Sequence, residues 1–114
     1  MLDFPKHKHL CGQQRIDELY KSGKRFVSWP VRVTYMPLKE EKADSLVLVW
    51  APKSLFKKAV DRNHLRRLMR EAYRLNQEMI QQPYMIAFNY MDKEVQPFFV
   101  IEKAVRKALK KINS

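Results

Sequence analysis

The chain has 114 residues and a mass of 13.7 kDa, which is the length of one ordinary domain. Its 46% hydrophobic and 11% aromatic content is enough for a core, which excludes a disordered basic tail, and its two glycines exclude fibrous and low-complexity sequences. The net charge of +11, from 23 Lys and Arg against 12 Asp and Glu, favours a polyanionic partner, with nucleic acid first and an anionic membrane surface second.

No part of the sequence approaches the roughly 20 apolar residues of a membrane span, and the amino terminus lacks the apolar centre of a secretory signal. The single cysteine, Cys11, cannot form an internal disulfide, so nothing requires an oxidising compartment. His7, His9 and Cys11 alternate like metal ligands, but no fourth ligand accompanies them, and we expect no metal site on the protein. We therefore expect a cytoplasmic protein with one domain over residues 1–114 and no membrane partner.

Residues 13–22 are predicted to form the first helix. Ile16, Leu19 and Tyr20 recur at spacings of three and four, which is typical of a helix with one apolar side. Gly23 follows directly and is expected to end the helix.

Two strands are predicted next. Residues 31–36 alternate between apolar and more polar side chains, whereas residues 45–51 are a β-branched and aromatic run that is apolar on both faces. The loop over residues 36–45 would connect them as a hairpin, with the second strand more fully buried.

The second half of the chain predicts a long helix over 57–79, a buried strand over 84–91 and a last helix over about 97–112. The expected core face of the long helix consists of Leu65, Leu68, Met69, Ala72 and Leu75. That of the last helix consists of Val100, Ile101, Ala104, Val105, Ala108, Leu109 and Ile112. The order α-β-β-α-β-α, with room for one further short strand, indicates an α+β fold.

The polar side of the long helix carries an arginine at every fourth position: Arg62, Arg66, Arg70 and Arg74. Such like-charged pairs destabilise an isolated helix by a few tenths of a kcal/mol each, and phosphates would offset this cost. The guanidinium group suits phosphates because it donates two parallel hydrogen bonds. A charged stripe can also be an ordinary solvated face, but that reading is less favoured here because residues 57–74 contain seven basic and only two acidic residues.

Aromatic side chains are the second expected ingredient, because single-stranded nucleic acid is held by stacking as well as by charge. Tyr20 and Tyr35 are favoured for this role, since each has a polar tip and lies among basic residues. We assign Phe88, Phe98 and Phe99 to the core.

Features of an independent catalyst are missing from the sequence. We find no glycine-rich phosphate loop, no paired carboxylates and no nucleophile with a plausible base. The chain is therefore not expected to be catalytic by itself or to act on a small-molecule substrate.

Residues 52–76, PKSLFKKAVDRNHLRRLMREAYRLN, resemble the signature of the bacterial ribonuclease P protein component, in which an Arg-Asn-Arg core is followed by further basic residues on one long helix. Residues 10–26, LCGQQRIDELYKSGKRF, are similar to the first helix of that family and the basic turn after it. Length, charge and element order agree as well, so the resemblance covers nearly the whole chain.

This resemblance implies a single RNA-binding domain, an α-β sandwich whose central sheet contains a left-handed βαβ crossover. Patterning could not predict that hand, because such crossovers are almost always right-handed. In the family, a large catalytic RNA that binds most of the Mg²⁺ removes the 5′ leader of precursor tRNA by hydrolysis. The protein binds this RNA through the basic helix and the leader through a cleft between the sheet and the first helix. The chain would thus be the protein subunit of an endoribonuclease.

The resulting site assignment has two parts. The candidate RNA-binding residues are Lys53, Lys57, Lys58, Arg62, Asn63, His64, Arg66, Arg67, Arg70 and Arg74. The candidate leader-cleft residues are Ile16, Tyr20, Phe26 and Tyr35. Two of them depart from the family pattern: His64 stands where an arginine would carry a permanent charge, and Ile16 stands where other members have an aromatic residue.

Three alternatives remain open. A non-catalytic structural RNA-binding protein, such as a ribosomal protein, would share the charge and fold class. A DNA-binding protein would need a short partner helix and turn directly before the basic helix, which the sequence lacks. An independent nuclease would need acidic residues, yet Asp61 and Glu71 are ten residues apart and lie beside arginines.

Overall fold

The computed structural model describes residues 13–38 and 44–113, so the amino-terminal histidines and Cys11 lie outside the described residues. Within these ranges the chain forms an α+β domain, which confirms the predicted fold class. Its elements are α1 (Gln13–Ser22), β1 (Lys24–Ser28), β2 (Val31–Pro37), β3 (Leu46–Trp50), α2 (Ala59–Asn76), the short 3₁₀ helix η2 (Gln77–Met79), β4 (Tyr84–Tyr90) and α3 (Phe98–Ile112).

The four strands form one mixed sheet in the order β1-β2-β4-β3. β1 and β4 are both antiparallel to β2, while β3 is parallel to β4. The expected hairpin between 31–36 and 45–51 is therefore wrong, because β4 lies between these two strands. β4 suits this central position because its residues are almost all apolar or aromatic on both faces, and six of its seven residues are buried there. β2 instead forms its hairpin with β1, the additional short strand, and β3, α2 and β4 form a parallel βαβ unit.

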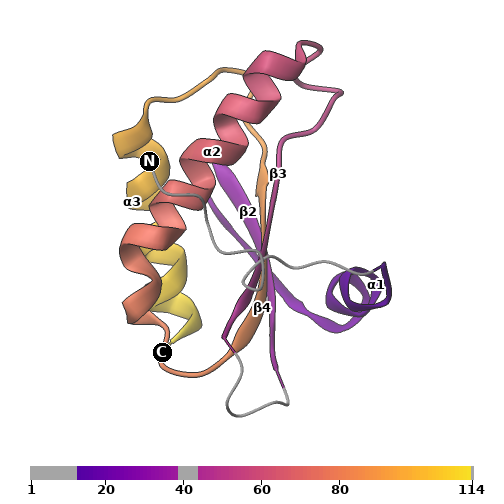
Figure 1. Cartoon of the computed structure of the whole chain (residues 1–114), viewed down its shortest axis with the longest axis vertical. Helices are drawn as coiled ribbons and strands as arrows, with labels where there is room; N and C mark the ends of the chain where they lie inside the picture. Colours follow the sequence, from indigo (N-terminus) through magenta and orange to yellow (C-terminus); the bar gives the residue numbers. More distant parts are fainter. Residues whose placement is uncertain (1–12, 39–43, 114) are drawn as a thin grey trace.

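The helices lie on opposite faces of the sheet: α2 and α3 cover one face, and α1 lies against the other (Figure 1). Side chains alternate along each strand, so each strand contributes to both faces. The main core lies under α2 and α3 and includes Val33, Leu65, Phe88 and Leu109. A smaller cluster of Leu19, Met85 and Ala87 joins α1 to the other face.

Three residues expected in the core are exposed: Leu75 by 55%, Phe99 by 72% and Trp50 by 46%. The buried residues of α2 are Leu65, Met69, Ala72 and Tyr73. At about 100° per residue, Tyr73 moves the centre of this stripe away from Leu75, which then falls outside it. Phe99 lies two residues before the buried Ile101, which at about 100° per residue puts it on the opposite side of α3. Trp50 is on the sheet face that α2 does not cover.

A glycine is required where α1 turns into β1. The Gly23 N–H donates to the carbonyl oxygen of Leu19 at 2.8 Å, and a Cβ added at Gly23 would lie 2.5 Å from that oxygen and 3.0 Å from the carbonyl oxygen of Tyr35. Since both neighbours are backbone atoms, a side chain can fit only if α1 moves away from the sheet.

Gly23→Ala is therefore expected to lower the free energy of unfolding by about 1–3 kcal/mol, as overpacking does elsewhere. Urea unfolding followed by circular dichroism measures this change. Ser22→Ala, at the exposed neighbouring position, is the matched control and should have little effect. Equal stability of the two variants would show that the backbone accommodates a side chain at residue 23.

Two buried tyrosines predict a loss of stability in alkali. Burial raises the pKa of both Tyr73 and Tyr90. The Tyr90 hydroxyl also donates to the carbonyl oxygen of Glu94 and accepts the Gln96 N–H at 2.9 Å, which fixes the loop before α3. Because the folded state favours the neutral phenols, their contribution is fully present below the ordinary tyrosine pKa and is lost as the pH rises through the folded value.

We expect the free energy of unfolding to fall as the pH rises above about 10, and to fall less in a Tyr73→Phe, Tyr90→Phe double variant. Thermal unfolding over this pH range measures the difference. An identical pH dependence in the variant would mean that these two phenols do not couple to folding.

Candidate nucleic-acid interface

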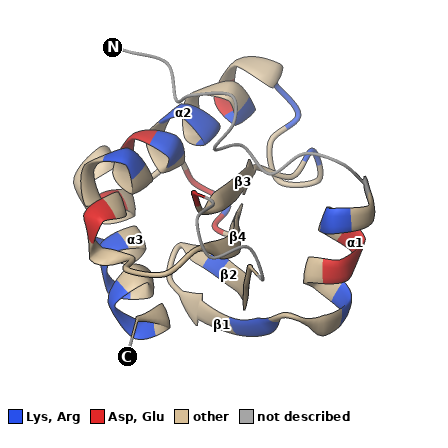
Figure 2. Cartoon of the chain, turned by 60° about the horizontal axis from the view of Figure 1, so that its bottom comes forward, with Lys and Arg blue, Asp and Glu red and all other residues tan. Residues whose placement is uncertain are grey.

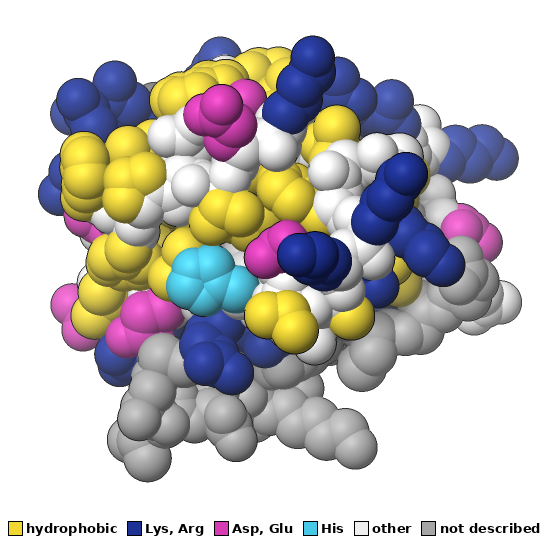
Figure 3. Space-filling model, turned by 90° about the horizontal axis from the view of Figure 1, so that it is seen from above, with side chains coloured by type: hydrophobic (Ala, Val, Ile, Leu, Met, Phe, Trp, Pro, Cys, Tyr) yellow, Lys and Arg dark blue, Asp and Glu magenta, His cyan; other side chains and the backbone are white. Residues whose placement is uncertain are grey.

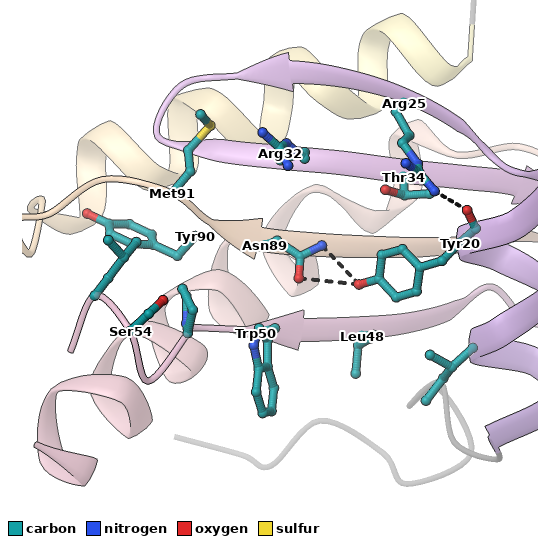
Figure 4. Close-up of a pocket in the computed structure, with 13 residues that line it drawn as sticks. Tyr20, Arg25, Arg32, Thr34, Leu48, Trp50, Ser54, Asn89, Tyr90 and Met91 are labelled. Carbon is teal, nitrogen blue, oxygen red and sulfur yellow. Dashed lines mark hydrogen bonds between the residues drawn. The ribbon is translucent and has the colours of Figure 1, made fainter. Parts of the chain in front are cut away.

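An open groove of about 810 Å³ lies on the face of the sheet that α1 flanks (Figure 4). The first helix contributes Ile16 and Tyr20 to its lining, and the strands contribute Arg32, Trp50 and Asn89. These strand residues share one face because side chains alternate along β2, β3 and β4. The geometry confirms a groove between the sheet and the first helix, as the resemblance implied.

Polar contacts hold α1 against the sheet at this groove. The Asn89 Nδ2 donates to the Tyr20 Oη at 2.9 Å, and the Tyr20 hydroxyl lies 3.3 Å from the Asn89 Oδ1 (Figure 4). The Arg25 guanidinium donates to the backbone carbonyl oxygen of Tyr20. Tyr20 is thus held at both its hydroxyl and its backbone carbonyl oxygen, and these contacts fix the position of its ring.

Among the described residues, the charged side chains that line the groove are all basic. Arg25 and Arg32 line it, and no acidic side chain belongs to the lining within the described part of the chain. Arg32 is exposed and makes no hydrogen bond or ion pair to any other described residue. An anion in the groove could therefore pair with Arg32 without displacing another described residue.

The arginines of α2 are less accessible than the sequence pattern suggests, since Arg62, Arg66, Arg70 and Arg74 are all partly buried. The Arg62 Nη1 donates to the carbonyl oxygens of Phe56 at 2.7 Å and Lys57 at 3.0 Å. Lys58 at the start of α2 makes no side-chain cap, and the Arg62 side chain adds a tie between the preceding segment and the helix.

Arg74 forms an ion pair within its own helix. Its Nε donates to the Glu71 Oε2 at 3.1 Å, and its Nη2 contacts the other carboxylate oxygen. The hydrogen bond lowers the pKa of Glu71 and raises that of Arg74. This local pairing engages the Arg74 guanidinium within the helix, so a phosphate would have to compete with Glu71 for it.

Other candidates from the basic segment are exposed: Lys53, Lys57, Lys58, Asn63, His64 and Arg67. Viewed from the end at which α2 begins, Lys and Arg side chains project on several sides of an apolar surface (Figure 3). Lys and Arg also line the outer side of α2 and of α3 (Figure 2). We call the four exposed basic residues of this segment the α2 basic surface: Lys53, Lys57, Lys58 and Arg67.

Arg66 connects the α2 basic surface to the groove. Its guanidinium lies over the Trp50 ring, with Cζ 4.9 Å from the ring centroid, and its Nη1 donates to the Asn63 Oδ1 at 3.1 Å. Trp50 lies at the end of the edge strand β3 and lines the groove. Helix and groove therefore meet at this pair of side chains and offer one extended surface.

Phe26 and Tyr35 lie outside this groove, which corrects their assignment to the cleft. Both pack on the core under α2 and α3, with ring centroids 5.8 Å apart, and the Lys111 ammonium lies 4.6 Å from the Phe26 ring centroid. Residues 31, 33 and 35 of β2 share that face, whereas Arg32 and Thr34 face the groove.

Three groove residues were missed from the sequence. The alternation of residues 31–36 could have identified Arg32, since it opposes the apolar positions. Asn89 was visible as the only amide in an otherwise apolar and aromatic strand. Trp50 gave no such signal, because it ends a run that is apolar on both faces.

The described residues contain no group of three or more His, Cys, Asp or Glu side chains that could hold a metal ion. None of the helices over residues 13–38 and 44–113 is both long and apolar enough to cross a bilayer.

Comparison with known proteins identifies the family. Residues 4–113 match the family model described as ribonuclease P. The ribonuclease P protein components of two Porphyromonas gingivalis strains are 37% identical to the chain over an aligned length of 115 residues. The alignment covers 94% of this chain and 84% of each relative.

Solved structures share the fold at lower identity. The RNase P protein from Thermotoga maritima matches with a TM-score of 0.80 and 22% identity, over 93% of this chain and 98% of that one. The Staphylococcus aureus RNase P protein matches with a TM-score of 0.79 and 19% identity, over 94% of this chain and 96% of that one. The chain therefore belongs to the ribonuclease P protein family, and its role is in tRNA processing.

Proposed function

We propose that this chain is the protein subunit of a ribonuclease P ribonucleoprotein, which binds the catalytic RNA and the 5′ leader of precursor tRNA. The observation that supports this most directly is the junction of the α2 basic surface with a groove that presents Tyr20, Arg32 and Trp50. The catalytic RNA would lie along the α2 basic surface, and the single-stranded leader would lie in the groove.

The proposed contribution of the protein is binding energy and substrate discrimination rather than a reacting group. Contact with the leader favours precursor over mature tRNA, because mature tRNA has no leader to fill the groove. Positive charge on α2 offsets the repulsion between RNA phosphates and so helps the folded RNA retain its Mg²⁺. The RNA, rather than the protein, would bind most of these ions. If five or six phosphates are neutralised, log affinity should fall with log salt at a slope near −4, at about −0.7 per contact.

The partly buried arginines have a second role in this proposal. Arg62 holds the backbone that carries Lys57, and Arg66 holds the ring of Trp50. They position the contact surface in addition to charging it. Both RNA partners place the working complex in the cytoplasm.

Leader cleavage at low, near-physiological Mg²⁺ tests the proposal. A bacterial ribonuclease P RNA is incubated with precursor tRNA, with and without this protein, and with an Arg62→Ala, Arg66→Ala double variant. We expect strong stimulation by the protein and its loss in the variant. A Lys103→Gln, Lys107→Gln variant of α3, which also removes two positive charges, is the matched control and should stimulate normally.

A structural RNA-binding protein is the second candidate function, and the same experiment separates it. Tight binding to the RNA without stimulation of cleavage would favour that alternative. Cleavage by the protein without added RNA would contradict both readings.

A further inference from the structure

Trp50 is the largest side chain left partly open in the groove. It is 46% exposed, although the neighbouring Val49 of the same strand is only 8% exposed. The alternation of β3 explains the difference, because Val47 and Val49 face the core while Trp50 faces the groove. An indole that is partly exposed at the edge of a sheet offers a flat apolar surface on which a ligand can pack.

One face of this indole is already occupied. The Arg66 guanidinium lies over the ring, and the Asn63 Oδ1 holds that guanidinium from the side of α2. The Arg66 Nε is buried without a hydrogen-bond partner in the described structure, so packing on the ring secures this edge of the group. The contact fixes the orientation of Trp50 and leaves its exposed part toward the groove.

The surroundings of the open ring indicate what would cover it. Arg32 and Arg25 line the same groove, and no acidic residue does so among the described residues. A ligand there must combine a flat apolar face with negative charge a short distance away. A nucleotide of single-stranded RNA has both, since its base stacks and its phosphate pairs with a guanidinium.

We propose that Trp50, held from α2 by Arg66, is a stacking site for one base of single-stranded RNA where the groove meets the basic helix. The inference rests on the proposed function. It assigns base stacking to the Trp50 ring, a contact that positive charge alone would not provide. Stacking accepts every base because each has a π face, so this site would favour unpaired RNA without requiring a sequence.

Fluorescence tests the stacking directly. The chain contains two tryptophans, and Trp29→Phe leaves Trp50 as the only one without altering the groove. This variant is titrated with an oligoadenylate of about eight nucleotides, within the usual site size of single-strand binders. Inorganic polyphosphate, which carries negative charge but no base, is the control ligand. We expect quenching by the oligoadenylate and none by the polyphosphate; equal quenching by both, or by neither, would overturn the proposal.

Binding by variants provides the second measurement. Trp50→Leu is expected to weaken oligoadenylate binding by about tenfold, whereas Trp50→Tyr should retain most of the affinity. The slope of log affinity against log salt should be the same in both, because no charge is removed. Trp29→Leu is the matched control, since Trp29 is 54% exposed but does not line the groove. Equal affinities of Trp50→Leu and Trp29→Leu would contradict the stacking site.

This outcome is separable from failure of the proposed function. Wild-type protein that stimulates leader cleavage while Trp50→Leu binds oligoadenylate normally would overturn the stacking site alone. Wild-type protein without any stimulation would overturn the ribonuclease P role, whatever the fluorescence shows.

Discussion

Replacing Lys57, Lys58 and Arg67 by glutamine is expected to weaken binding of a ribonuclease P RNA by about 100-fold at about 0.1 M salt. Each lost phosphate contact at a slope of about −0.7 corresponds to roughly fivefold at this concentration, so three contacts multiply to about 100-fold. The slope itself should become shallower by about two. Filter binding over a range of KCl concentrations measures both quantities. All three side chains are exposed, so the fold should not change.

The last helix provides a control with the same change in charge. Lys103, Lys107 and Lys110 are exposed on α3, which lies beside α2 but away from the groove. Replacing these three by glutamine should reduce RNA affinity only slightly, through the general loss of positive charge. Equal losses in the two triple variants would show that RNA is attracted by net charge and not by the α2 basic surface.

Leu65→Ala is expected to lower the free energy of unfolding by about 2–5 kcal/mol, the usual cost of truncating a buried leucine. Leu65 is a fully buried residue of α2 that packs in the main core. Its removal leaves a cavity in the main core, and the helix that carries the basic surface loses its central contact. Denaturant unfolding gives the free energy, and RNA affinity measured well below the unfolding midpoint shows whether the basic surface is also disturbed.

Leu75→Ala is the matched control on the same helix. Leu75 is 55% exposed, so its truncation removes little buried area and should cost less than about 1 kcal/mol. The two leucines share a face in the sequence pattern, and only the structure distinguishes them. Similar costs for both substitutions would contradict the placement of Leu75 outside the buried stripe of α2.

Local structure could be predicted well because it depends on neighbours in the chain. The first helix was expected at 13–22 and lies at Gln13–Ser22, and the last was expected to begin near 97 and begins at Phe98. Spacing of apolar residues and a glycine after the first helix carry this information. The long helix was expected to continue to 79, but it ends at Asn76 because the chain tightens into the short η2 turn.

Part of the site could be predicted in the same way. Tyr20 and the basic residues of α2 were identified from charge, spacing and resemblance. Tyr20 lines the groove and Arg67 is exposed, whereas the other arginines of α2 are partly buried. The degree to which Arg62 and Arg74 are engaged could not be predicted. Their partners are backbone carbonyl oxygens and Glu71, and which partner an arginine selects depends on the packed geometry.

By itself, the sequence determined that this protein is a small basic α+β domain with one arginine-rich helix, because composition and periodicity are properties of the chain alone. Only the tertiary structure decided that β4 separates β2 from β3, since strand order depends on which apolar faces pack together. That order brings Arg32, Asn89 and Trp50 from three strands onto one face, and it sends Phe26 and Tyr35 to the other. The groove is made of contacts between residues distant in the chain, which no local pattern encodes.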